Sequence, residues 1–183
     1  MKKALAVLIT LVVVVGALTV INYNTLVSLE EDVHNKWSMV ENNYQRRADL
    51  IPNLVNTVKG VAKQENELFT NIARLRSGYS DANTPEEYAK LDADLKAAIN
   101  LTVEAYPELK SNENFLKLQD ELEGSENRIA IARKDYNDSV ATFNKKIRRF
   151  PTNLFASAFG FERVEFFESV QGAEQAPAVN FGN

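Results

Sequence analysis

The sequence predicts an all-helical protein in which an N-terminal transmembrane helix precedes a bundle of long helices. Residues 4–21 contain no charged side chain. Further along the chain, apolar residues recur at alternating spacings of three and four, which is typical of helices that pack against helices. The length of 183 residues is enough for one domain with a core of its own.

The first predicted element is a membrane anchor over residues 1–22. Its apolar run reads ALAVLITLVVVVGALTVI and would span roughly 27 Å as a helix, close to the ~30 Å of a hydrocarbon core. A cleavable signal peptide has an apolar stretch of about 7–15 residues followed by a small-residue cleavage site. The run here is longer, and Asn22-Tyr23-Asn24 follows it without such a site. We therefore expect an uncleaved single-pass anchor.

The charges on either side of the anchor predict its orientation. Lys2 and Lys3 precede the apolar run, whereas Glu30, Glu31 and Asp32 follow it. Positively charged flanks stay in the cytoplasm. We therefore expect the N-terminus to be cytoplasmic and the rest of the chain to lie on the other side of the membrane.

A helical domain is predicted over residues 23–168, and its first helix carries a long apolar seam. This seam comprises Val33, Trp37, Val40, Tyr44, Ile51, Leu54, Val58, Val61, Leu68, Ile72 and Leu75. Pro52 should kink the helix or end it near Ile51, because proline lacks the N–H that a helix interior requires. The seam keeps the same phase on both sides of Pro52, which favours one long, kinked helix that closes at Gly78.

Two more helices follow. Thr84-Pro85-Glu86-Glu87 has the pattern of a capping box with proline at the first helical position, and Pro107 marks the end of the helix near Ala105. The next helix starts near Ser111 or Asn112 and ends at Phe150, before Pro151. Its seam is Phe115, Leu118, Leu122, Ile129, Tyr136, Val140, Phe143, Ile147 and Phe150.

The segment after Pro151 is rich in phenylalanine. We identify its aromatic residues as candidate contacts with a partner or the membrane: Phe155, Phe159, Phe161, Phe166 and Phe167. One interpretation is a short helix and an extended strap that dock on the bundle; the other is an exposed aromatic surface. The tail over residues 169–183 is expected to be flexible.

Composition argues against most chemistry. The chain has no cysteine and one histidine, His34, so thiolate sites, zinc sites with several histidines and a carboxylate-bridged di-metal site are excluded. It has no phosphate-binding glycine loop. The formal net charge of −4 argues against nucleic-acid binding. We therefore predict no enzyme activity, catalytic residue, cofactor or metal; a site built only from Glu and Asp is the least favoured alternative.

Charged residues close to the seams predict a structural polar network. ENELFTNIAR runs from Glu65 to Arg74, and ENRIAIAR runs from Glu126 to Arg133. A third charged cluster contains Arg46, Arg47 and Asp49. These residues could form exposed ion pairs that contribute little. Because Arg47 and Glu65 fall on the seam itself, a buried or inter-subunit network that fixes register is the other interpretation.

Several blocks of the sequence resemble the LemA family. They are QRRADLIPNLVNTVKG (45–60), YPELKSNENFLKLQDEL (106–122), ENRIAIARKDYN (126–137) and FPTNLFASAFGFERVEFFE (150–168). The resemblance implies a bacterial membrane protein with an antiparallel bundle of long helices, a LemA-like four-helix bundle. It also implies a link to a magnetosome-associated branch, and it brings no catalytic residues. This chain lacks the lipoprotein cysteine of some relatives, so direct insertion must anchor it.

These observations predict a non-enzymatic scaffold or assembly protein of the bacterial cell envelope, held in the inner membrane with its helical domain on the periplasmic or extracellular side. It would act through coiled-coil-like self-association as a homo-oligomer, or by binding another envelope membrane protein. The alternative is a ligand- or lipid-binding sensory module, which predicts an apolar cavity near Trp37 or under the C-terminal phenylalanines.

Overall fold

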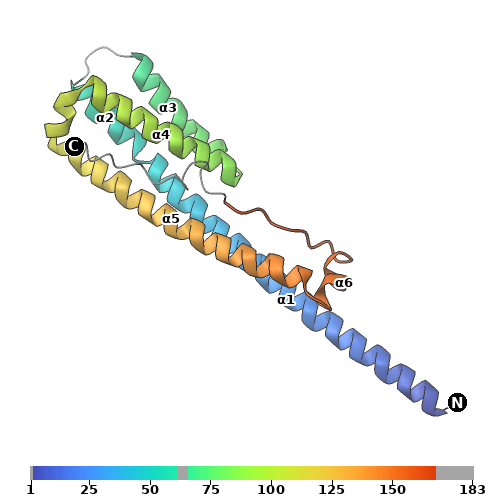
Figure 1. Cartoon of the computed structure of the whole chain (residues 1–183). Coiled ribbons are helices and arrows are strands. Elements are labelled where there is room, and N and C mark those ends of the chain that lie inside the picture. Colours follow the sequence, from blue (N-terminus) through green and yellow to red (C-terminus); the bar gives the residue numbers. More distant parts are fainter. Residues whose placement is uncertain (1, 62–65, 168–183) are drawn as a thin grey trace, which may run out of the picture. The chain divides into compact units, whose positions relative to one another are not determined.

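The chain is helical throughout most of its described length, residues 2–61 and 66–167 of the computed structural model (Figure 1). The elements are α1 (Lys2–Ala48), α2 (Ile51–Val61), α3 (Asn66–Asp81), α4 (Pro85–Ala105), a short 3₁₀ helix η1 (Pro107–Ser111), α5 (Glu113–Arg148) and α6 (Thr152–Ala156). No strand occurs in these two ranges. The predicted all-helical class is confirmed; the antiparallel four-helix arrangement stays a prediction.

The chain divides into two compact units. The first unit contains Met1–Asn42 and Ile129–Phe166, and the second contains Asn43–Arg128 and Phe167–Asn183. Helices α1 and α5 each contribute to both units. The domain boundary predicted at residue 22 falls inside α1, and the tail over 169–183 lies outside the described residues, so that predicted division is untested.

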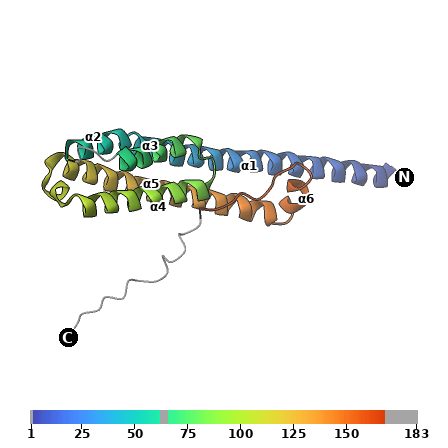
Figure 2. The same ribbon diagram turned by 90° about the horizontal axis from the view of Figure 1, so that it is seen from above.

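The first unit is built on the antiparallel pairing of α1 and α5. Asn22 contacts Thr152 near one end, and Trp37 packs on Tyr136 further along. Most of the apolar side chains that α1 and α5 bury in this unit belong to the two predicted seams, and Leu26 and Ala132 are buried in addition to them. From α1 they are Leu26, Val33 and Val40, and from α5 they are Ile129, Ala132, Tyr136, Val140, Phe143 and Ile147. Helix α6 completes the unit beside these two helices in both views (Figures 1 and 2).

The N-terminal part of α1 differs from the rest of the first unit because its apolar side chains are exposed. Leu5, Val7, Leu8 and Val12 are all more than half exposed. Among the described residues, α1 is the helix that is long and apolar enough to cross a membrane. Its apolar segment continues into the packed part of α1 without a break.

In the second unit, α3 packs against both α2 and α4 (Figures 1 and 2). The core is contributed by every element of this unit: Tyr44, Ile51, Leu54, Val58, Ile72, Leu75, Tyr79, Tyr88, Leu95, Leu109, Phe115, Leu118 and Leu122. The prediction of one long helix through Gly78 is wrong. Helix α2 ends at Val61, and α3 lies beside it as a separate helix.

Pro52 ends α1 rather than kinking it. A continuous helix would need the N–H of residue 52 to bond to the carbonyl of Ala48, and proline has none. The chain instead makes a turn in which the Leu50 N–H donates to the Arg47 carbonyl at 3.1 Å. Helix α2 then starts at Ile51, so Pro52 lies in the first turn, where no N–H is missed.

The start of α4 confirms the predicted capping box. The Glu87 N–H donates to Thr84 Oγ1 at 3.3 Å, and the Thr84 N–H donates to Glu87 Oε2 at 3.1 Å. Glu87 Oε2 also accepts from the Asn83 N–H at 2.8 Å. These N–H donors hold the pKa of Glu87 below its ordinary value of 4.5. Asn112 caps α5 in a similar way, accepting from the N–H groups of Asn114 and Phe115.

Candidate functional site

A charge network lies in the second unit and contains Arg47, Tyr79, Asp92, Lys96 and Glu126. Arg47 comes from the last turn of α1 and is only 3% exposed. It is buried because it occupies a seam position in the helix, three residues after Tyr44 and four before Ile51, and both of these are buried. A buried guanidinium requires a partner, because leaving water costs a charge several kcal/mol.

Asp92 of α4 is the closest partner of Arg47. Arg47 Nη1 donates to Asp92 Oδ1 at 2.6 Å, which is the short distance expected of a charge-assisted hydrogen bond. The Tyr79 hydroxyl, from α3, donates to the same oxygen at 3.2 Å. Burial, together with the negative charge of Asp92, raises the pKa of Tyr79 far above its ordinary value of 10.0. Asp92 therefore joins three helices at one carboxylate.

Tyr79, which bonds to this carboxylate, belongs to a cluster of stacked tyrosines. Tyr44 stacks on Tyr88 with ring centroids 4.4 Å apart, and Tyr79 stacks on Tyr44 at 5.8 Å. All three rings are buried. Such a cluster excludes water from the neighbourhood of the ion pair and strengthens its electrostatics.

The network continues to the surface through Glu126 of α5. Glu126 Oε2 lies 3.9 Å from Arg47 Nη2, and its other oxygen accepts from Lys96 Nζ at 3.1 Å. Lys96 and Glu126 are 64% and 46% exposed, so this outer pair contributes little to stability. Among the described residues of this network, Arg47 Nε is buried without a hydrogen-bond partner.

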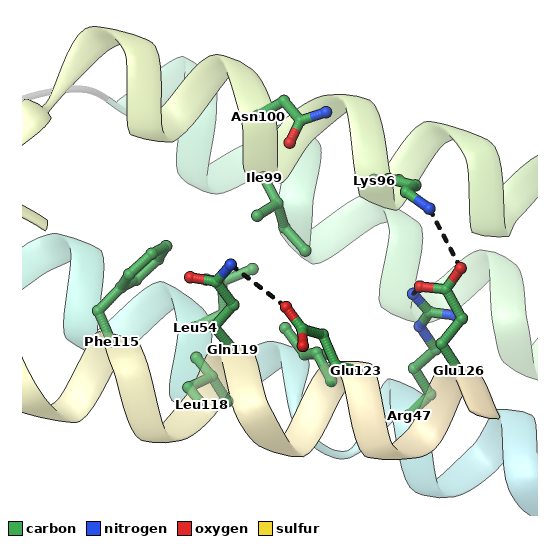
Figure 3. Close-up of a pocket in the computed structure, with 11 residues that line it drawn as sticks. Arg47, Leu54, Lys96, Ile99, Asn100, Phe115, Leu118, Gln119, Glu123 and Glu126 are labelled. Carbon is green, nitrogen blue, oxygen red and sulfur yellow. Dashed lines mark hydrogen bonds and ion pairs between the residues drawn. The ribbon is translucent and has the colours of Figure 1, made fainter. Parts of the chain in front are cut away.

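A cavity of about 110 Å³ adjoins the network (Figure 3). Arg47, Lys96 and Glu126 lie together at one part of its wall. Apolar side chains form much of the rest: Leu54, Ile99, Phe115, Leu118 and Leu122. The residues of this wall come from the second unit, and they include neither Trp37 nor a C-terminal phenylalanine, the two places for which the ligand-binding alternative predicted a cavity. An amphiphilic molecule could place its polar group beside the charges and its apolar part on Phe115 and Leu118.

The other predicted network residues differ in exposure and in the unit to which they belong. Arg46, Asp49 and Arg74 are exposed. Arg133 is half-buried on α5, but it belongs to the first unit. Glu65 lies outside the described residues. Within the described ranges, no group of three or more His, Cys, Asp or Glu side chains could hold a metal ion.

Sequence reasoning missed Asp92, although a signal was present. Asp92 lies four residues after Tyr88 and three before Leu95, and both of these are buried. It therefore occupies a seam position in α4, as Arg47 does in α1. A search for opposite charges at seam positions of different helices would have paired the two residues.

A second polar cluster, in the first unit, holds the irregular segment 157–166 that follows α6. The side-chain amide of Asn144 on α5 donates to the Val164 carbonyl at 2.8 Å and accepts from the Val164 N–H at 3.0 Å. The Tyr136 hydroxyl donates to the Glu165 carbonyl at 3.0 Å. Burial, and then the charge of Glu165, raise the pKa of Tyr136. Neutral side chains thus satisfy backbone groups that no helix or sheet satisfies.

Helix α6 and the segment after it are joined to α1 where the apolar run ends. The Thr152 hydroxyl donates to Asn22 Oδ1 at 2.8 Å, and both residues are buried. Tyr23 contacts Phe159 and Phe161 edge-on, with ring centroids 5.2 Å and 5.9 Å apart. Asn22 itself donates back to the Leu18 carbonyl. The segment is therefore fixed to the α1 residues that directly follow Ile21.

The five candidate phenylalanines are not equivalent. Phe161 and Phe167 are buried, Phe155 is half-buried, and Phe159 and Phe166 are exposed. Phe161 also contacts Phe143 of α5. The short helix and docked strap of the sequence interpretation describe most of this segment, and two exposed rings remain for a contact with other molecules.

The fold and these clusters define a helical protein with one long, exposed apolar helix segment at its N-terminus and buried polar contacts between its helices. A sequence model of the LemA family matches residues 36–181, and the chain belongs to the LemA family. The match covers most of the helical body and leaves out residues 1–35.

The chain is similar in sequence to the following relatives over part of their length. Protein LemA of Metamycoplasma hominis is 27% identical over 150 residues, which cover 80% of this chain and 68% of the relative. Magnetosome protein MamQ 2 of Paramagnetospirillum magneticum is 30% identical over 181 residues, covering 83% and 66%. Magnetosome protein MamQ of Magnetospirillum gryphiswaldense is 29% identical, covering 79% and 64%. The chain thus spans about two thirds of the length of these relatives.

Proposed function

We propose that this chain is a non-enzymatic scaffold of the bacterial cell envelope, anchored by α1 and acting through self-association or by binding another membrane protein. The observation that carries the proposal is the continuity of α1. Within the first unit, the exposed apolar segment and the packed segment that contacts α5 are one helix. A helix that leaves the bilayer without a hinge fixes the orientation of the packed unit, whereas a flexible tether would leave it free.

Two further points support the proposal. Confinement to a membrane raises the local concentration of identical chains, which favours association. The similarity to relatives that are named magnetosome proteins is also consistent with a function at a membrane compartment. The buried Arg47 charge of the second unit pairs with Asp92 and lies near Glu126, as expected of groups that set helix register rather than groups that perform chemistry.

The scaffold is tested by measuring the mass of the full chain in nanodiscs extracted from native membranes. We expect an oligomer or a stoichiometric complex with another membrane protein. In Ser28→Pro, proline interrupts α1 at an exposed position early in its packed segment, between the buried residues Leu26 and Val33. This variant should stay in the membrane and lose the assembly, while Ser28→Ala should keep it. Single chains without a companion in the unmodified protein would contradict the proposal.

We also propose that the N-terminus is cytoplasmic in the inner membrane and that the helical body lies on the opposite side. The charge asymmetry of Lys2 and Lys3 against Glu30, Glu31 and Asp32 supports this orientation. Leu101→Cys introduces one thiol at a position that is 63% exposed in a chain without cysteine. An impermeant maleimide should label this variant in intact cells whose outer barrier is opened. Labelling only after lysis would show the opposite orientation.

The cavity favours a second candidate function, a ligand- or lipid-binding sensory module. Ile99 lines the cavity and is half-buried, so Ile99→Trp should fill the space with little damage to the core. Leu101→Trp is the matched control, because Leu101 is on the same helix, exposed and outside the cavity wall. If the module binds a ligand, native mass spectrometry should find it on the control and not on Ile99→Trp. If no ligand is found on either variant or on the unmodified chain, the scaffold remains as the proposed function.

A further inference from the structure

The surface where α1 emerges from its apolar run combines exposed apolar side chains with basic ones. We name the apolar set the collar: Tyr23, Phe150, Leu154 and Phe159. Their exposed fractions are 42%, 80%, 61% and 47%. All four belong to the first unit, which also contains the N-terminal part of α1. Their position relative to that part of α1 is therefore set within one compact unit. Isolated exposed apolar residues need no explanation, but four on one short stretch of structure do.

The hydrogen bond and ring contacts at Asn22 and Tyr23 fix the depth of the collar. Residues 4–21 span roughly 27 Å as a helix, slightly less than the ~30 Å hydrocarbon core. If this run crosses the bilayer, Asn22 and Tyr23 lie at its edge. Thr152 is bonded to Asn22, and Phe159 contacts Tyr23, so α6 and the turn after it lie at the same depth. Aromatic side chains are favoured at that depth.

A basic cluster directly precedes the collar. It consists of Lys145, Lys146 and Arg148 in the last turn of α5 and Arg149 directly after it. In the described part of the chain, none of the four forms an ion pair. The nearest acidic residues in sequence on the docked segment are Glu162 and Glu165, beyond Phe161. Basic residues at a helix C-terminus also stabilise the helix itself, and the experiment must separate that role from lipid binding.

We propose that the collar and the basic cluster form a docking surface for anionic phospholipid at the membrane surface. Phe150, Leu154, Phe159 and Tyr23 insert into the interface, and Lys145, Lys146, Arg148 and Arg149 contact the phosphate groups. The inference rests on the membrane anchoring proposed above. It adds a second, lipid-selective contact, which would hold the end of α5 against the bilayer in addition to the anchor.

The absence of cysteine permits a direct test with single fluorescent labels on the full chain in nanodiscs. Leu154→Cys reports the collar. Ile131→Cys is the matched control, because it is an apolar residue of the first unit that is 55% exposed and outside the collar. Val12→Cys, 64% exposed within the apolar run, reports the anchor itself. Each label is exposed to a water-soluble quencher and, separately, to a quencher carried on lipid chains.

The proposal expects the labels at positions 154 and 12 to be quenched from the lipid and shielded from water, and the label at 131 to behave in the opposite way. Equal quenching from water at 154 and 131 would overturn docking while the label at 12 still reports anchoring. A label at 12 that lipid does not quench would overturn the anchor itself. Shielding at 154 without quenching from the lipid would mean that protein covers the collar, which also overturns the proposal.

The lipid selectivity is tested by comparing nanodiscs of phosphatidylcholine with nanodiscs that also contain phosphatidylglycerol. Arg148→Gln with Arg149→Gln should lower the ratio of shielded to exposed label at 154 by roughly fivefold per arginine in the anionic discs, and little in the neutral ones. Lys110→Gln with Lys117→Gln removes two exposed lysines of the second unit and is the control. If the arginines only cap the helix, stability falls and the ratio is the same in both lipids, which would overturn the selectivity.

Discussion

The two units of the molecule bury polar groups in different ways. In the second unit, the polar contact that joins separate helices at the buried Arg47 is ionic, and the Arg47 guanidinium meets the Asp92 carboxylate between α1 and α4. In the first unit, the buried polar contacts are neutral, and Asn144, Tyr136 and Thr152 bond to backbone groups or to another amide. The difference follows from what each unit must hold in place.

A helix satisfies its own backbone, so side chains between helices are free to pair with each other. The second unit uses this freedom to join α1, α3 and α4 at Asp92, and we propose that this contact specifies how the helices align. The segment after α6 cannot satisfy its own backbone, so the first unit supplies donors and acceptors from α5. An ion pair therefore joins helices in one unit, and amide chemistry holds an irregular segment in the other.

The largest effect is expected from separating the buried ion pair of the second unit. Asp92→Ala leaves the Arg47 charge buried beside Glu126 alone, at 3.9 Å, and should cost about 3 kcal/mol. Thermal unfolding of the full chain in detergent, followed by circular dichroism, measures the loss. Hydrogen exchange should locate it in α3 and α4 and leave the Val164 amide protected.

A double variant decides whether the pair itself stabilises the unit. Arg47→Met with Asp92→Leu removes both charges and keeps apolar volume, and such replacements are often neutral or stabilising. We expect stability close to that of the unmodified chain, together with a less specific helix alignment visible as broadened amide resonances. A double variant as unstable as Asp92→Ala would show that the pair contributes net stability.

A smaller, local effect is expected from the neutral contacts of the first unit. Asn144→Ala removes the side-chain amide that bonds to both the N–H and the carbonyl of Val164. The loss should cost roughly 2 kcal/mol. The loss should appear as faster hydrogen exchange and faster proteolysis between residues 157 and 166, with the second unit unchanged. Asn153→Ala, at an exposed asparagine, is the control. If Asn144→Ala destabilised the second unit equally, the contrast between the units would be lost.

Much of the fold could be predicted because its signals are local. The capping box at Thr84, the prolines at 52 and 107 and the seams of α1 and α5 each act through a few neighbouring residues. The separation of α2 from α3 could not be predicted in this way. Val61 and Leu68 keep the seven-residue phase of the seam, so periodicity alone does not distinguish one helix from two that pack together.

The site was predicted in part for a similar reason. Arg47 could be predicted because a charge at a seam position requires a partner. Asp92 also occupies a seam position, but it was not predicted. Asn144 carried a weaker one. It lies beside Phe143 on the buried side of α5, but its partner, Val164, is twenty residues away on an irregular segment. The local sequence does not indicate that the partner of an asparagine is a backbone group.

The alkaline response should distinguish the two buried tyrosines. The pKa of Tyr79 is raised, so the native state resists losing the proton that the unfolded chain loses near pH 10.0. Its contribution is present below that pH and declines as pH rises above it. Tyr79→Phe should cost about 1 kcal/mol at neutral pH through the lost hydrogen bond, and it should flatten the alkaline decline. Following α3 and α4 by hydrogen exchange across this pH range measures both effects.

Tyr136→Phe is the counterpart in the first unit. Its pKa is also raised, mainly by burial, and its hydroxyl bonds to the Glu165 carbonyl rather than to a carboxylate. The alkaline change should then appear around residue 165 and not in α4. Identical profiles for the two variants would mean that the units unfold together and would remove the basis for comparing them.

The smallest expected effect is an acid response confined to the start of α4. The lowered pKa of Glu87 means that the unfolded chain takes up a proton at a higher pH than the native chain does. The contribution of Glu87 is therefore complete above its ordinary value of 4.5 and is lost as pH falls through the lower native value. Glu87→Gln should abolish this part of the acid response and leave the first unit unchanged, as measured by melting temperature against pH. Glu86→Gln, one residue earlier on the same exposed turn, is the control, and an equal change there would assign the response to the helix dipole instead of the capping box.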